Sequence, residues 1–316
     1  MPDETSLHSV SEDGILSIMF DSDLRRFLAQ HGIHLNKDLG QHFLINESVL
    51  ETIVRTADIR PTDHILEIGA GIGILTRELL KRAQKVTAIE IDAKLIPLLK
   101  EFVNIPDTLD HSKKSDPFRV MVSPSNHEAR DTNGIGHATE PPRLTIINNN
   151  ALHVPFPKEP YKIVANIPYH ITSPLLRHAF LESALPPTSL TLLIQREVAE
   201  KICDTKNAGL LTIVVSLFGA PRIVANIPPS AFLPPPKVDS AILHIKCFEK
   251  PLASQELINR IFALIKLAFS QKRKMLRNTV GSLSDGIDLL KRARVDPQRR
   301  PQTLAIDEWI RLAKEQ

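Results

Sequence analysis

The sequence contains little cysteine and no long apolar run. Only 2 of its 316 residues are cysteines, Cys203 and Cys247, and neither has a partner at metal-ligand spacing. We therefore expect neither a disulfide framework nor a zinc or other metal site. No stretch approaches the ~20 apolar residues of a membrane span, so no membrane segment is predicted. The first residues are acidic and lack the apolar core of a secretory signal, which favours a cytoplasmic protein.

Charge of one sign is not in large excess either. The net charge of +3, with 42% hydrophobic and 24% charged residues, is ordinary for a globular chain of this length. The basic residues are unevenly spread, however. Many lie between residues 266 and 300, where four stand close together: Lys272, Arg273, Lys274 and Arg277. Such a local excess is typical of a surface that binds nucleic-acid phosphates, although a solvated helix face gives the same pattern.

Strand patterns alternate with helix patterns through most of the chain. The predicted strands are residues 63–68, 85–91, 144–148, 161–165, 190–194, 222–225 and 241–245. The predicted helices are residues 49–57, 74–82, 94–102, 173–181, 197–202 and 210–218. This alternation predicts an α/β fold built from βαβ units around a parallel sheet.

The domain organisation is predicted from changes in composition. Residues 1–36 are expected to form an N-terminal arm, followed by an α/β domain over residues 37–250. Residues 103–142 are crowded with polar residues, Pro and Gly, so we expect an insertion there without regular structure. From residue 255 onward only helix patterns remain, which predicts a small helical domain over residues 251–316.

A glycine-rich turn follows the first predicted strand of the α/β domain. Gly69 and Gly71 allow the backbone to turn tightly and to approach a ligand closely. Dinucleotide-binding proteins share such a turn, but their third glycine would fall at Ile74, so that fingerprint fails. The acid at the end of the strand, Glu67, is typical of methyltransferases instead.

Two polar positions near the ends of the next strands suggest a nucleoside ligand. Glu90 ends the second strand about 20 residues beyond the turn, where a carboxylate can accept both ribose hydroxyls, although a solvated strand-end acid would look the same. Asn150 follows the third strand, where its side-chain oxygen could accept a hydrogen bond from an adenine amine. Asn148 or Asn149 could take that part instead.

The fourth strand ends in Asn166, Ile167, Pro168 and Tyr169, which we call the 166–169 turn. An adenine amine is a poor nucleophile because its lone pair is delocalised into the ring. Acceptance of its protons by the Asn166 side-chain oxygen and the Ile167 carbonyl would favour a pyramidal nitrogen with an available lone pair. Pro168 stiffens the turn, and Tyr169 offers a face on which an extruded base can stack. The turn therefore predicts methyl transfer to an adenine amine, in which positioning and electrostatics supply the acceleration.

Six ordered segments together resemble the ribosomal RNA adenine dimethyltransferases. They are residues 39–44, 67–73, 166–169, 195–199, 232–240 and 269–278. That superfamily includes small-subunit enzymes and the erythromycin-resistance methylases of large-subunit RNA. The resemblance covers about residues 23–102 and 143–316, and it leaves residues 103–142 foreign to the family pattern.

The resemblance implies a Rossmann-like class I methyltransferase sheet with a C-terminal helical domain that binds RNA. It implies S-adenosylmethionine as the methyl donor. By motif position, the resemblance implies donor contacts from His42, Leu44, Gly69, Glu90, Asn150 and Asn166. We expect Gly71 of the glycine turn to contact the donor as well. His42 stands where asparagine is usual and Asn150 where aspartate is usual, and an amide accepts a hydrogen bond less strongly than a carboxylate.

The 232–240 segment and the closing residues 302–312 look more like the small-subunit branch of the family. This likeness implies dimethylation of the N6 amines of two adjacent adenines in the 3′-terminal hairpin of small-subunit ribosomal RNA, with a role in small-subunit biogenesis. The expected partner is that RNA or the immature small subunit, bound by a monomer. The alternatives are a resistance-type methylase of large-subunit RNA and a non-catalytic RNA-binding assembly or transcription factor. The intact 166–169 turn argues against the non-catalytic alternative.

Overall fold

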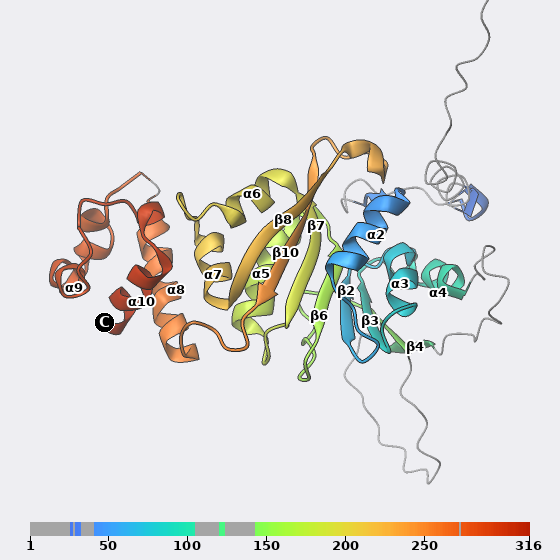
Figure 1. Cartoon of the computed structure of the whole chain (residues 1–316), viewed down its shortest axis with the longest axis horizontal. Helices are drawn as coiled ribbons and strands as arrows, with labels where there is room; N and C mark the ends of the chain where they lie inside the picture. The colour runs from blue at the N-terminus through green and yellow to red at the C-terminus, as the bar shows by residue number, and fades with distance from the viewer. Residues whose placement is uncertain (1–25, 28, 33–40, 105–119, 124–142, 272) are drawn as a thin grey trace, which may run out of the picture.

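A computed structural model describes residues 26–27, 29–32, 41–104, 120–123, 143–271 and 273–316 (Figure 1). Its large sheet contains β2 (His64–Ile68), β3 (Lys85–Glu90), β4 (Val120–Ser123), β5 (Leu144–Asn148), β6 (Lys162–Asn166), β7 (Ser189–Gln195), β8 (Gly219–Ile227) and β10 (Ser240–Cys247). The strand order is β4-β5-β3-β2-β6-β7-β10-β8. Pairing is parallel from β4 to β7, and β10 runs antiparallel to both β7 and β8. The predicted α/β fold is confirmed.

Helices cover both faces of this sheet because its central strands are apolar on both sides. Ile65 of β2 packs into the apolar cluster that contains buried residues of α2 (Glu47–Thr56), α3 (Ile74–Leu80) and α4 (Ile96–Asn104). Its neighbours Leu66 and Ile68 belong to the cluster on the other face, with α5 (Thr172–Arg177), α6 (Arg196–Cys203) and α7 (Leu210–Phe218). Side chains alternate between the faces of a strand, so β2 contributes to both halves of the core.

The strand order reverses at β2. From β2 the chain continues to β3 on one side, and it later returns to place β6 on the other side of β2. In open α/β sheets, ligands bind outside the carboxyl ends of the strands at such a reversal. The glycine turn follows β2 and the 166–169 turn begins at the end of β6, so both predicted motifs lie at this point of the sheet.

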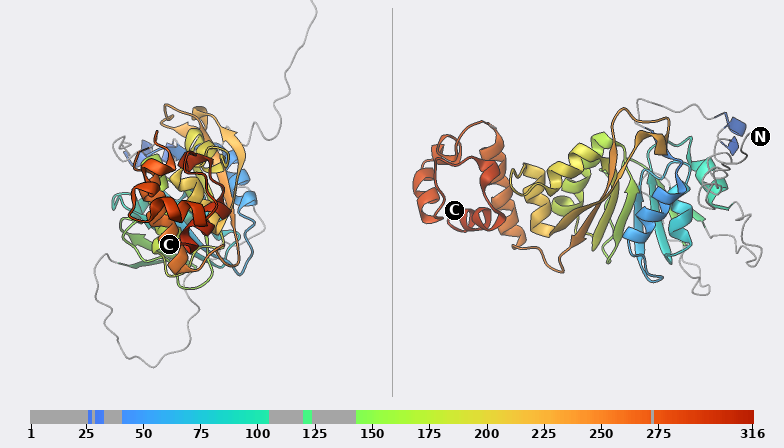
Figure 2. Two further views of the ribbon diagram at one scale, coloured as in Figure 1. Left: turned by 90° about the vertical axis from the view of Figure 1, so that its left-hand side faces the viewer. Right: turned by 45° about the horizontal axis from the view of Figure 1, so that its top comes forward.

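The C-terminal part is helical and extends the molecule along its long axis (Figures 1 and 2). It contains α8 (Gln255–Phe269), α9 (Gly286–Arg292) and α10 (Ile306–Lys314), with short 3-10 turns between them. The Ser254 hydroxyl caps α8 by accepting from the Leu257 amide at 3.3 Å. Leu264 of α8 and Trp309 of α10 are buried in the same apolar cluster as α7 and the sheet. The apolar core therefore runs without a break across residue 250, where we predicted a domain boundary.

A second, small sheet was not expected from the sequence. β1 (Phe43–Leu44) pairs antiparallel with β9 (Phe232–Leu233), so that Phe43 lies opposite Leu233 and Leu44 opposite Phe232. β9 lies in a proline-rich stretch between the strands predicted at residues 222–225 and 241–245, where no strand was predicted. Two-residue strands are too short to produce a sequence pattern. Their pairing nevertheless holds two segments nearly 190 residues apart side by side.

The segment 103–142 also differs from expectation. The structure places β4 inside it, parallel to β5 at the edge of the large sheet, with Val120 opposite Leu144 and Ser123 opposite Ile147. The expectation that this whole segment lacks regular structure is therefore wrong. Residues 105–119 and 124–142 lie outside the described residues, as does almost all of the predicted arm 1–36.

Candidate functional site

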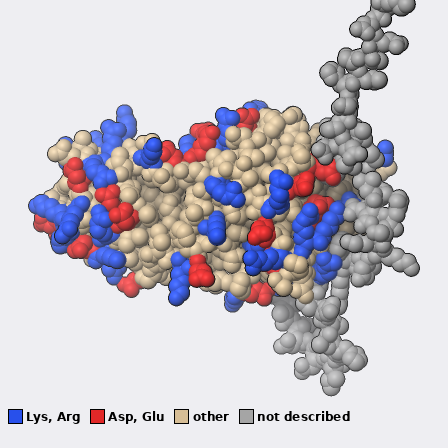
Figure 3. Space-filling model, viewed as in Figure 1, with Lys and Arg blue, Asp and Glu red and all other residues tan. Residues whose placement is uncertain are grey.

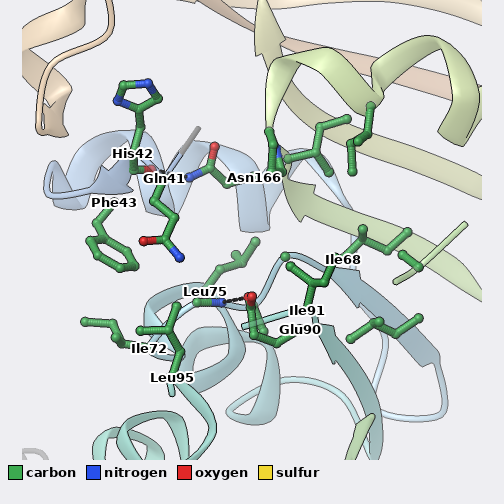
Figure 4. A pocket seen from close by; sticks show the side chains of 18 of the residues that line it. Gln41, His42, Phe43, Ile68, Ile72, Leu75, Glu90, Ile91, Leu95 and Asn166 are labelled. Atoms are coloured by element: carbon green, nitrogen blue, oxygen red, sulfur yellow. Dashed lines mark hydrogen bonds between the residues drawn. The ribbon is translucent and has the colours of Figure 1, made fainter. Parts of the chain in front are cut away.

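A pocket lies at the carboxyl ends of β2, β3 and β6, where the strand order reverses (Figure 4). Its walls include every residue that we predicted for donor binding and for catalysis: His42, Leu44, Gly69, Gly71, Glu90, Asn150, Asn166, Ile167, Pro168 and Tyr169. These residues come from five separate parts of the sequence. The structure thus brings the predicted donor-binding and catalytic residues together in one cavity.

The glycine turn forms the floor of the pocket. Gly69 and Gly71 have φ angles of +72° and +60°, which residues with a Cβ rarely adopt. A Cβ on Gly71 would also lie 3.0 Å from the ring of Phe43. The amides of Gly69 and Ala70 both donate to the carbonyl of Ile89, which ties the turn to β3. The site therefore has a cradle in which backbone, not side chain, faces the cavity.

Glu90 is the acid of the pocket. Its side chain is 5% exposed, and its two carboxylate oxygens accept from the backbone amides of Gly71 at 2.7 Å and Asp92 at 2.9 Å. Burial raises the pKa of the Glu90 carboxyl above its ordinary value, while these amide bonds oppose that rise. Each carboxylate oxygen has a further lone pair, so Glu90 can still accept from a ligand's hydroxyls.

Glu67 lies behind the glycine turn and does not line the pocket. It is 1% exposed, and one carboxylate oxygen accepts from the Thr76 hydroxyl at 2.6 Å. Burial raises the pKa of Glu67 to about 8, and the nearby Glu90 adds to the rise, while the bond from Thr76 opposes it. Glu67 is therefore protonated through much of the neutral range.

The three consecutive asparagines at positions 148–150 differ in their contacts. The Asn148 amide donates to the carbonyls of Glu90 and Ile91 and does not line the pocket, whereas Asn149 and Asn150 both line it. The Asn150 oxygen accepts from the Leu152 amide at 3.0 Å. Its Nδ2 has no hydrogen bond to the described protein, so Asn150 offers a ligand a donor, whereas the sequence analysis expected its oxygen to accept from an adenine amine.

Asn166 lies across the cavity from Glu90, and its side chain points toward the Gln41–His42 stretch (Figure 4). Its Nδ2 donates to the backbone carbonyl of His42 at 3.1 Å, which leaves its Oδ1 as an acceptor. The His42 ring does not point at Glu90. It lies nearly parallel to the Tyr169 ring, with centroids 6.0 Å apart, and its Nδ1 is 2.7 Å from the Pro234 carbonyl oxygen.

Tyr169 begins a short 3-10 turn, Tyr169–Ile171, beside the pocket. Its hydroxyl bonds the Ser240 hydroxyl at 2.6 Å. Partial burial raises the pKa of the Tyr169 phenol, so the ring is neutral at physiological pH. The sequence analysis gave Ser240 no role, and no local pattern could have done so, because the two residues are 71 positions apart.

Several pocket residues have no counterpart among the predicted ones. Ile91 follows Glu90 directly and is 56% exposed, and Ile72, Leu75 and Leu95 form an apolar wall near the glycine turn (Figure 4). An apolar residue directly after a strand-end acid is the sequence signal that could have identified Ile91. The combination of an apolar wall, a buried acid and amide groups suits a nucleoside with a polar tail.

The predicted RNA-binding residues lie away from the pocket, between α8 and α9. Arg273, Lys274 and Arg277 are exposed and form no ion pair with any residue that the structure describes, whereas Lys272 lies outside the described residues. Several other basic residues of the C-terminal part are paired with acids, as Lys291 is with Asp288 and Arg292 with Asp285. Figure 3 shows this mixture of basic and acidic side chains at the C-terminal end.

No described helix has the length and apolarity to cross a membrane. In the same part of the chain, no group of His, Cys, Asp and Glu side chains could hold a metal ion, and both cysteines are free.

The family model for ribosomal RNA adenine dimethylase matches residues 32–123 and 135–316. The match extends through β4, so between residues 32 and 316 only residues 124–134 have no counterpart in it, far fewer than the predicted insertion of 103–142. Ribosomal RNA small subunit methyltransferase A of Dehalococcoides mccartyi is 36% identical over 92% of this chain and 91% of its own length. The enzyme of the same name from Alkaliphilus metalliredigens is 35% identical over 94% of this chain and 97% of its own.

Solved structures agree with this assignment. A dimethyladenosine transferase from Plasmodium falciparum is 26% identical, with a TM-score of 0.62 over 84% of this chain and 94% of its own. The 23S rRNA methyltransferase ErmE is 27% identical, with a TM-score of 0.59 over 86% of this chain and 98% of its own. The fold is thus that of the Rossmann-like methyltransferases. The chain belongs to the ribosomal RNA adenine dimethylase family, and it is an S-adenosylmethionine-dependent methyltransferase of ribosomal RNA adenines.

Proposed function

We propose that this enzyme dimethylates the N6 amines of two adjacent adenines in the 3′-terminal hairpin of small-subunit ribosomal RNA, as a step in small-subunit biogenesis. Its relatives at 35–36% identity act, by their names, on small-subunit RNA. The observation that carries the proposal is the meeting of the 166–169 turn with the glycine turn in one pocket. A Cβ on Gly69 would lie only 3.5 Å from Pro168 and 3.6 Å from the Asn166 carbonyl oxygen.

The methyl donor would be held by the glycine cradle and by Glu90. S-adenosylmethionine, when bound, supplies a methyl group on a positively charged sulfur. The Glu90 carboxylate would accept from ribose hydroxyls, the Asn150 amide would contact the adenine ring, and Leu44 would pack against the apolar part of the ligand. His42 and Asn166 would complete the donor site from the opposite wall. The buried acid and the positive-φ glycines fit such a ligand.

The target amine would be held by the 166–169 turn. Since the Asn166 Nδ2 already donates to the His42 carbonyl, its Oδ1 is free to accept one amine proton, and the Ile167 carbonyl would accept the other. Both contacts favour a lone pair on nitrogen that points at the methyl group. Pro168 restricts the turn, and the neutral ring of Tyr169 would stack on the extruded base. Positioning and electrostatics would carry the acceleration.

The RNA would be held through its phosphates by the C-terminal helical domain. Arg273, Lys274 and Arg277 support this part of the proposal because no described acid neutralises them, and Lys272 would act with them. We also place the enzyme in the cytoplasm, as a monomer that acts on immature small subunits. The large exposed apolar residues of the described surface are few and come from separate segments, which suits a monomer.

Mapping of the modified nucleotides tests the proposal directly. The purified enzyme and labelled methyl donor are incubated with immature small subunits and, separately, with large-subunit RNA. We expect label on the paired adenines of the small-subunit hairpin. Label on large-subunit RNA alone would favour a resistance-type methylase and overturn the proposal.

Asn166→Ala tests the catalytic assignment within the same assay. We expect methyl transfer to be abolished while donor affinity stays within about tenfold, because the residue acts mainly on the amine. Calorimetry measures the donor affinity and initial rates measure the turnover. Near-normal turnover in the variant would refute the role of Asn166.

A further inference from the structure

The 232–240 segment lies behind the 166–169 turn and contacts it from outside the pocket. At one end of the segment, β9 pairs with β1, and the Pro234 carbonyl oxygen lies 2.7 Å from Nδ1 of His42. At the other end, the Ser240 hydroxyl bonds the Tyr169 hydroxyl at 2.6 Å. The 232–240 segment is one of the six that resemble the family, but the sequence analysis assigned no function to its residues. Its two ends therefore contact two residues that line the pocket, His42 and Tyr169.

Ser240 has a fixed position in the sheet. It is 0% exposed, and as the first residue of β10 it pairs with Gln195 of β7 on one side and Ile227 of β8 on the other. A hydroxyl on a buried strand between two neighbours moves little. Tyr169, in contrast, is only partly buried and stands in a single 3-10 turn at the pocket wall. The bond therefore links a partly exposed residue of a short turn to a buried residue that strand pairing holds on both sides.

We infer that Ser240 is a positioning residue for the target base, which holds the Tyr169 ring at the angle at which an extruded adenine can stack on it. The inference rests on the proposed role of Tyr169. Base stacking alone needs only the ring, and it would make Tyr169→Phe harmless. The structure shows instead that the hydroxyl has a buried partner, and a ring without that bond can turn away from the stacking orientation.

Two single variants and their combination test the inference. Tyr169→Phe and Ser240→Ala each remove one end of the same bond. For each we expect donor affinity within about twofold of wild type, because neither change touches Glu90 or the glycine turn. We expect kcat on RNA to fall about three- to tenfold, the effect of losing one hydrogen bond, with a smaller change in KM. The double variant should be no slower than the slower single variant.

Thr191→Val is a matched control. Thr191 is also a 0% exposed hydroxyl of the large sheet, on β7, and it bonds Nδ1 of His244 at 3.0 Å without touching the pocket. Loss of its hydroxyl should lower thermal stability and leave kcat unchanged below the melting temperature. A kcat loss in Ser240→Ala that matches one in Thr191→Val would show a merely structural effect and overturn the inference.

The outcomes separate this inference from the proposed function. All rates are compared with wild type on whichever ribosomal RNA the wild type methylates, so failure on small subunits counts only against the proposed substrate. Full kcat in Tyr169→Phe would overturn the inference even if Ser240→Ala did not fold. A fold-loss of kcat in the double variant equal to the product of the two single fold-losses would also overturn it, because the two hydroxyls would then act separately.

Discussion

Glu90 is the residue whose chemistry decides whether the pocket can hold the methyl donor. We expect Glu90→Gln to weaken donor binding about 10- to 100-fold, because an ionised acceptor bonds hydroxyls more strongly than an amide does. In the wild type, affinity should fall as the pH is lowered through the raised pKa of Glu90, since the protonated acid accepts less well. Calorimetry at several pH values measures both effects.

Asp92→Asn is the control for this prediction. Asp92 is also an acid just beyond β3, but its oxygens accept from Gln41 and from the Lys94 amide, and it does not line the pocket. Its loss should change donor affinity little. Equal losses in both variants would mean that general negative charge, and not a contact from Glu90, attracts the donor.

Glu67 is predicted to make stability depend on pH. Its folded-state pKa of about 8 lies above the ordinary value near 4.5, so the folded chain holds a proton that the unfolded chain releases. The stability linked to that proton is complete below the unfolded pKa and is lost as the pH rises through about 8. The free energy of unfolding of the wild type should therefore fall relative to Glu67→Gln between pH 6 and pH 8.5. Urea unfolding without donor measures it, and a constant difference would show that Glu67 is ionised when folded.

At the scale of elements, the long apolar runs could be predicted and the short contacts could not. β5 and α7 begin and end where their patterns predict, because each is a mainly apolar run with polar residues or glycine on either side. The predicted helix 173–181 ends early as an α-helix, at Arg177, and continues as a π-helical turn to Glu182. β1, β9 and the Ser240 bond depend on partners far away in sequence, and no local pattern contains them.

The same holds for the site. The glycine turn, Glu90 and the 166–169 turn could be located because each directly follows or ends a predicted strand, and strand ends meet at one edge of a parallel sheet. Which asparagine of the 148–150 triple faces the pocket could not be decided, since backbone hydrogen bonds turn Asn148 away. The amide orientation of Asn166 likewise depends on the His42 carbonyl, 124 residues away.

Two deletions distinguish the true insertion from the strand that lies near it. Removal of residues 124–134, which the family model skips, should leave a folded enzyme that binds the donor, because the family pattern does without them and loop-closure entropy depends only weakly on length. Removal of residues 107–140 also deletes β4 and leaves the edge of β5 unpaired, so it should destabilise the protein. Thermal unfolding compares the two. A drop of more than ~10 °C for the short deletion would show that residues 124–134 support the fold.

At the scale of the whole molecule, the cations at the far end should hold RNA without regard to its sequence. Replacement of Arg273, Lys274 and Arg277 by Gln should weaken binding to all RNAs and reduce the salt dependence by roughly 0.7 to 0.9 per lost phosphate contact. The control replaces Lys291, Arg292 and Arg311, which acids already neutralise. Binding titrations at several salt concentrations measure how steeply affinity falls with salt. An equal change in both variants would show that Arg273, Lys274 and Arg277 have no special role in RNA binding.

The unbroken apolar core sets the distance between the pocket and the cations of the C-terminal part. Leu264 and Trp309 share one cluster with Leu192 of β7 and Ile167 of the 166–169 turn, so the end that carries the cations cannot swing freely against the pocket. In an enzyme of the proposed function, an RNA stem gripped at that end meets the pocket at a set interval along its axis. The enzyme would then select an adenine by its distance from the RNA phosphates that the cations bind. A stem one base pair longer would place the target adenine beyond Tyr169.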